Sequence, residues 1–145
     1  ASIPAGRGAH LPVISPDGRY GYVANFASDS LTVWDCHNHH VIASIPVGIY
    51  PHFFALSTDG DWLVVSNTGE SSVCIIDARR HEIRARLQVG PAPAHLAFSP
   101  DNQCAFVGWE SSDEVVVIDL RKQTILESVK AGQLGPRSNR SQDEL

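Results

Sequence analysis

The sequence has no methionine, only three cysteines and no long run of apolar residues. Without an encoded initiator, the chain as given is expected to be a processed product or a piece of a longer protein. An odd number of cysteines with no CxxC pair argues against a disulfide framework and leaves the redox compartment open. No stretch approaches the roughly 20 apolar residues that span a bilayer, and no signal-peptide pattern is present. We therefore expect no membrane span.

Concentrated charge of one sign is also missing. The net charge is −5, and acidic and basic residues are interspersed along the chain. Phosphate binding needs a concentrated basic face, so this distribution argues against a nucleic-acid partner. The hydrophobic fraction of 43% and the charged fraction of 19% are those of an ordinary globular protein.

What the sequence does contain is an internal repeat. Shifted by 42 residues, the chain matches itself without a gap, and this register holds for several families of identical residues. These families are Gly6, Gly48, Gly90 and Gly132; Ser15, Ser57 and Ser99; Asp17, Asp59 and Asp101; Val23, Val65 and Val107; and Asp35, Asp77 and Asp119.

The repeat divides the chain into three full units, 6–47, 48–89 and 90–131. Each unit holds four short apolar segments rich in β-branched and aromatic residues, which favour strands. Turn sequences such as SPDG separate the segments. Each unit therefore reads as a four-stranded antiparallel meander, and four strands in a period near 40 are typical of a β-propeller blade.

The predicted fold class is all-β: a propeller segment of three four-stranded antiparallel blades plus a remnant outer strand at the N-terminus. Residues 1–5 match the last five of a unit and are assigned to that remnant of a preceding blade. Residues 132–145 are wholly polar after their first positions and are expected to be disordered. Closed propellers have about four to eight blades. We therefore expect further blades from a longer chain or a second copy, and self-association through exposed blade flanks.

A family resemblance rests on the tetrads YVAN (22–25), VVSN (64–67) and FVGW (106–109), which share one register. With the surrounding pattern, they resemble the YVTN-type β-propeller repeats over residues 1–131. The third unit departs most, with Asn102 in place of the turn glycine and Trp109 in place of the tetrad asparagine. The resemblance implies a bacterial or archaeal protein, often periplasmic or on the cell surface. Similar repeats occur in the d-type haem domains of nitrite reductases.

Three histidines are candidate ligand-face residues. His10 and His52 occupy the same repeat position, and His95 lies one place later. Each begins an inner strand, so all three are expected at the mouth of the channel, as metal or haem ligands or as a general base. Equivalent positions in adjacent blades are expected to diverge around the rim. That favours the alternative of strand-start residues whose rings bond to nearby backbone.

Trp109, Glu110 and Asp113 are the other candidates on that face. An indole beside carboxylates suits a cationic or sugar-like group, while core packing against the next blade is an equal alternative for the tryptophan.

A second cluster consists of Cys36, His37, His39 and His40. These residue types bind transition metals, but neighbours in a turn point in different directions, so a polar solvated turn is favoured. The aspartates that recur in every unit are interpreted as structural acceptors of turn amides.

No G-x-S-x-G, HExxH, P-loop, G-x-G-x-x-G or CxxCH motif occurs. The leading prediction is a non-enzymatic binding or scaffolding module with a protein or small-molecule ligand at its loop-rich face. The first alternative, from the resemblance, is part of a redox propeller that binds d-type haem. A weaker alternative is a lactonase-like hydrolase.

Overall fold

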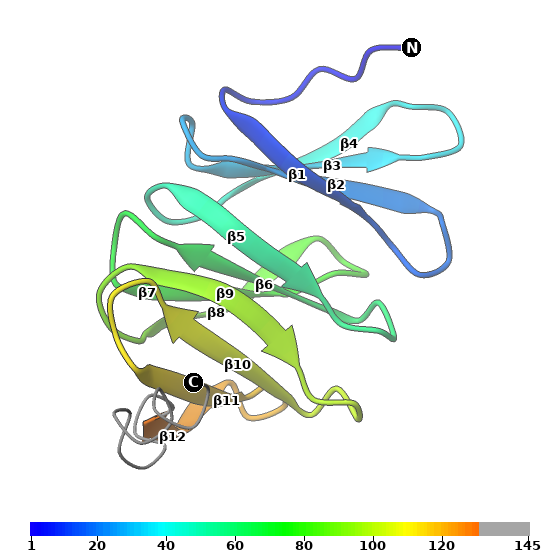
Figure 1. Ribbon diagram of the computed structural model, residues 1–145. Helices are drawn as coiled ribbons and strands as arrows, with labels where there is room; N and C mark the ends of the chain where they lie inside the picture. The colour runs from blue at the N-terminus through cyan, green and yellow to red at the C-terminus, as the bar shows by residue number, and fades with distance from the viewer. Residues whose placement is uncertain (131–145) are drawn as a thin grey trace, which may run out of the picture.

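The computed structural model describes residues 1–130, which form twelve strands in three four-stranded antiparallel sheets (Figure 1). The first sheet contains β1 (Ala9–Ile14), β2 (Tyr20–Asn25), β3 (Ser30–Asp35) and β4 (Val41–Pro46). The second contains β5 (Pro51–Leu56), β6 (Trp62–Asn67), β7 (Ser72–Asp77) and β8 (Glu82–Gln88). The third contains β9 (Pro93–Phe98), β10 (Cys104–Trp109), β11 (Glu114–Asp119) and β12 (Thr124–Lys130).

The all-β prediction is confirmed: strands pair only with their chain neighbours, and each sheet lies within one repeat unit. Residues 1–130 contain no helix, and so none that is long and apolar enough to cross a membrane. The predicted polar tail, 132–145, lies outside the described residues.

The repeated serine and aspartate build the turn between the first two strands of each sheet. Ser15 Oγ donates to Asp17 Oδ1 at 2.6 Å, and the amide of Tyr20 donates to Ser15 Oγ at 2.9 Å. The second and third sheets repeat both bonds through Ser57 and Ser99. These identities are therefore explained by folding alone.

The same turn needs a backbone with positive φ. Gly18 and Gly60 have φ values of 73° and 76°, and Asn102, which replaces the glycine in the third unit, has a φ of 57°. Asparagine tolerates this left-handed region better than most residues. Its amide also bonds across to the neighbouring sheet, with Nδ2 2.8 Å from Thr58 Oγ1 and Oδ1 3.2 Å from the Thr58 amide. Asn102 therefore fits the turn in place of glycine and also links the third sheet to the second.

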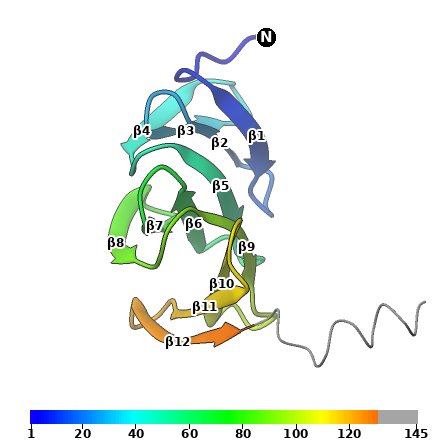
Figure 2. The same ribbon diagram turned by 60° about the vertical axis from the view of Figure 1, so that its left-hand side comes forward.

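The sheets stack side by side along an arc, with β1, β5 and β9 as the neighbouring inner strands (Figures 1 and 2). One apolar cluster joins the first and second sheets, and a second cluster joins the second and third. The second sheet therefore has both faces buried, with Leu63 and Val64 on opposite faces and each 0% exposed. In contrast, every residue of β12 is exposed.

The arrangement gives two ends, which we name by their connections. The loop face carries the residues before each inner strand and the turns after each second strand, and backbone bonds join the two sets, as from Phe26 N to Gly8 O and from Thr68 N to Tyr50 O. The turn face carries the serine–aspartate turns and the turns after each third strand, joined by bonds such as Ala78 N to Asp61 O.

Residues 1–6 precede β1 and belong to no strand. Ile3 and Ala5 line a shallow hollow of about 390 Å³ with Val23 and Trp34 on the free flank of the first sheet. The assignment of residues 1–5 to the outer strand of a further blade stays a prediction.

Candidate functional site

An aromatic band crosses the loop face at the start of the inner strands. It is made of ring-bearing side chains in mutual contact: His10, Phe26, Tyr50, His52, Phe53 and His95. The sequence placed the three histidines here, and the structure brings all three into one continuous set of rings.

The histidines approach one another more closely than expected. The rings of His10 and His52 stack with centroids 4.8 Å apart and planes at 21°. The Phe53 ring lies between His52 and His95, with its centroid 4.5 Å from that of His52 and 4.4 Å from that of His95. The expectation that equivalent positions diverge around the rim is therefore wrong for the first two sheets, because the inner strands pack directly against each other there.

The phenylalanines and the tyrosine of the band were not singled out from the sequence. Phe26 follows the end of β2 at Asn25, and Tyr50 precedes β5, so both residues lie in loops. Their ring centroids are 5.0 Å apart. Aromatic residues in loop positions are the signal that was available, since loops rarely need rings for their own folding.

Tyr50 is held in a backbone conformation that suits glycine. Its φ is 53°, and the equivalent positions, Gly8 and Ala92, have φ values of 72° and 51°. The left-handed region costs a residue with a Cβ on the order of 1 kcal/mol. Even so, the Tyr50 side chain is 42% exposed, so little burial offsets the cost. The conformation belongs to this position of the repeat, and what distinguishes Tyr50 there is its large exposed ring.

The loops around the band are acidic. Asp29, Glu70, Glu110 and Asp113 lie in the loop-face segments, against a single basic residue, Arg7. Asp29 Oδ1 accepts from the Tyr50 amide at 2.9 Å. The hydroxyl of Ser72 donates to Glu70 and lowers the pKa of that carboxyl below its ordinary value, so it is ionised at neutral pH. Glu70 also forms an ion pair with Arg86, with Nη1 and Oε1 3.2 Å apart, so the excess negative charge of these loops rests on Asp29, Glu110 and Asp113.

Of the other predicted ligand-face residues, Glu110 and Asp113 are exposed. Trp109 is half-buried: its indole lies over Gly90, where a Cβ would come within 2.6 Å of the ring, and packs against the core of the second and third sheets. Its Nε1 is buried and has no partner among the described residues.

The Cys36–His40 turn lies on the opposite, turn face. Asp35 Oδ1 accepts from the amides of His37 and Asn38 at 2.7 and 3.2 Å, and these bonds lower the pKa of Asp35. The rings of His37, His39 and His40 are exposed. Within residues 1–130, no group of three or more histidine, cysteine, aspartate or glutamate side chains is arranged to hold a metal ion.

Solved structures with a similar fold are numerous. Hydrazine synthase of Kuenenia stuttgartiensis superposes with a TM-score of 0.81 at 27% identity, over 94% of this chain and 39% of that one. The WD40 repeats of RRP9 match with a TM-score of 0.76 at 17% identity, over 87% of this chain and 39% of that one. The dihydro-haem d1 dehydrogenase NirN, in complex with DHE, superposes with a TM-score of 0.54 at 20% identity, over 90% of this chain and 39% of that one.

The chain thus spans about two fifths of the length of each of these neighbours. Curated protein sequences give no match. The model of the YNCE-like β-propellers, however, matches residues 1–143, nearly the whole chain. Together with the three stacked four-stranded sheets, this match shows that the chain belongs to the YNCE-like β-propeller family.

Proposed function

We propose that the chain is a non-enzymatic binding module whose aromatic band takes a basic segment of a partner protein. The observation that carries the proposal is Tyr50, an exposed ring on a strained backbone among other rings and carboxylates. A guanidinium stacks on an aromatic face and is attracted by nearby acidic groups, with a gain of about 0.5–2 kcal/mol for each cation–ring contact. A basic segment matches both properties of the band.

The test uses fluorescein-labelled hexa-arginine and fluorescence anisotropy, with hexa-lysine and hexa-glutamate as comparison peptides. Hexa-arginine is expected to bind best, because lysine lacks the planar group that stacks on rings. Tyr50→Asn removes the ring but keeps a residue that accepts positive φ, and it is expected to weaken hexa-arginine binding about five- to tenfold.

The matched control is Ala92→Asn, which makes the same change of backbone type at the equivalent position of the next unit. It carries no ring and is expected to leave binding unchanged. Equal affinity of the parent and Tyr50→Asn for hexa-arginine would refute the proposal, as would equal binding of the arginine and lysine peptides, since attraction to net charge alone would explain both results.

A redox propeller is the second candidate, and the stacked imidazoles favour it. Within residues 1–130, no hydrogen bond engages the ring nitrogens of His10, His52 or His95, so they are available as ligands. Imidazole is a common axial ligand of haem iron, and a bound haem would supply electron-transfer chemistry. Titration with d-type haem tests this candidate: a saturable absorbance change that His52→Ala abolishes is expected, and an unchanged spectrum would refute it. The hydrolase alternative stays a prediction.

A further inference from the structure

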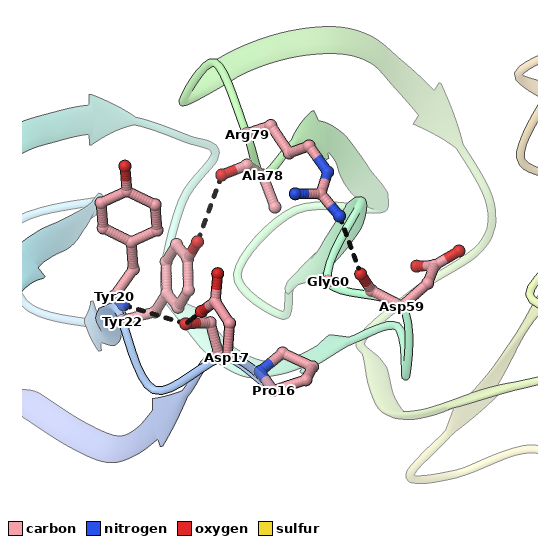
Figure 3. Close-up of a pocket in the computed structure, with 9 residues that line it drawn as sticks. Pro16, Asp17, Tyr20, Tyr22, Asp59, Gly60, Ala78 and Arg79 are labelled. Carbon is pink, nitrogen blue, oxygen red and sulfur yellow. Dashed lines mark hydrogen bonds between the residues drawn. The ribbon is translucent and has the colours of Figure 1, made fainter.

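A second site lies on the turn face, where the first and second sheets meet. A cavity of about 220 Å³, which we call the junction cavity, opens between their serine–aspartate turns (Figure 3). Its walls include Asp17, Tyr20 and Tyr22 from the first sheet and Gly60 and Arg79 from the second. At about 30 Å³ per water, it has space for a molecule of several heavy atoms.

The cavity follows from small residues at positions where the repeat carries larger ones. The first junction has Gly60 and Ala78 where the second has Asn102 and Leu120. Asn102 hydrogen-bonds across the second junction, and Leu120 is 0% exposed. The small Ala78 is matched by a larger residue on the facing strand, since Tyr22 stands where the second junction has Val64 and its hydroxyl bonds to the Ala78 carbonyl. The opening at the first junction is therefore assigned to Gly60, which has no side chain to bond across as Asn102 does.

The walls of the junction cavity carry opposite charges that do not pair with each other. The guanidinium of Arg79 forms its ion pair with Asp61 and donates from Nη2 to the carbonyl of Asp59 at 3.1 Å, which leaves further N–H groups free. The carboxylate of Asp17 accepts from Ser15 and Arg19 through Oδ1, so Oδ2 is left as an acceptor. One wall can bind a carboxylate and the other a cation.

The remaining wall is aromatic. Tyr22 is 1% exposed, and its hydroxyl donates to the carbonyl of Ala78 at 3.2 Å. Burial raises the pKa of Tyr22 to about 12, so the phenol stays neutral. Tyr20 lies beside it, fixed edge-on against the His81 ring at 4.9 Å. Tyr22 therefore closes the inner end of the cavity, and the half-buried Tyr20 ring is the aromatic surface left for a ligand.

We propose that the junction cavity binds a free α-amino acid with an apolar side chain. The carboxylate meets Arg79, the ammonium group meets Asp17, and the side chain packs on the Tyr20 ring. A zwitterion is the ligand class that satisfies both charged walls at once. The site lies at the opposite end of β1 from the aromatic band and does not depend on it.

Isothermal titration calorimetry of the full chain with L-leucine tests the proposal. Saturable binding with a Kd of about 1 mM or below is expected. N-acetyl-L-leucine lacks the ammonium group and L-leucine amide lacks the carboxylate, so each is expected to bind at least about tenfold more weakly. Absence of saturable heat up to roughly 20 mM leucine would overturn the proposal, and so would equal binding of either derivative.

Variants locate the site. Gly60→Asn introduces the residue that the second junction holds at this position, and asparagine accepts the positive φ. It is expected to abolish leucine binding while hexa-arginine binding at the aromatic band is unchanged. Asp17→Asn keeps the acceptor that the turn needs and removes the charge, so it should weaken leucine but not N-acetyl-leucine. Asp101→Asn is the matched change in the third unit and should have no effect. Unaltered leucine binding in Gly60→Asn, or equal losses in Asp17→Asn and Asp101→Asn, would refute the site.

Discussion

The contact between Gly21 and Trp34 gives the sharpest test of how the sheets are packed. These residues are direct partners on β2 and β3, and a Cβ at Gly21 would lie 2.1 Å from Cε2 and Cζ2 of the indole. Favourable carbon contacts need about 3.5 Å or more. Gly21→Ala therefore forces the ring or the strand to move by more than an ångström.

We expect Gly21→Ala to destabilise the chain by about 3 kcal/mol, at the upper end of the usual cost of overpacking. For a chain of this length, such a loss lowers Tm by roughly 6–9 °C. The other sheets show how the clash is relieved: the same pair is Leu63 with Ile76 in the second sheet and Ala105 with Ile118 in the third. A side chain is tolerated there because the partner is isoleucine.

The effect of Gly21→Ala on stability should therefore change from unfavourable to favourable when Trp34 is replaced by isoleucine. In a Trp34→Ile background, Gly21→Ala should stabilise by about 0.5–1 kcal/mol, because glycine in a strand costs that much relative to alanine. Urea unfolding followed by far-UV circular dichroism on all four chains gives the coupling energy directly. A cost below about 1 kcal/mol in the parent, or the same cost in both backgrounds, would refute the packing argument.

Three further predictions concern single residues. Asn102→Ala should lower stability about 1 kcal/mol more than Asn102→Gly, because both lose the bonds to Thr58 but only alanine is strained at positive φ; equal urea midpoints would contradict this. Ser15 holds the pKa of Asp17 below its ordinary 3.8, so the bond contributes stability above that pH that is lost as pH falls through the lower folded value. Ser15→Ala should flatten the fall of Tm between pH 4 and pH 2.5, and parallel curves would exclude the linkage. Burial raises the pKa of all three cysteines, but only Cys74 is 0% exposed, so a thiol reagent at pH 8 should label the other two cysteines first; three equal rates would contradict the buried position.

The strands were predictable because the repeat encodes its own local structure. Ser15 and Asp17 bond within one turn, and the apolar segments between such turns have the length and composition of strands. The contacts inside one unit can therefore be predicted from its own 42 residues, and the same residues recur in the other two units.

The sites depend on contacts between units, and the sequence carries those less directly. The stacking of His10 on His52 is set by the distance between two inner strands, which no local pattern specifies. The junction cavity arises where two small residues of the second unit, Gly60 and Ala78, face the serine–aspartate turn of the first unit. An alignment of the units would have marked both as small for their positions, but not that they share a wall.

The uniform spacing also bears on how the gene can change length. Recombination between two units in register would add or delete one whole unit, and the strands brought together would be the ones that already meet at a boundary. Only unit-specific partners across a boundary, such as Asn102 and Thr58, would then face a different neighbour. The number of repeat units in such a protein can therefore change by one at a time, and each change creates one new boundary between sheets that must pack.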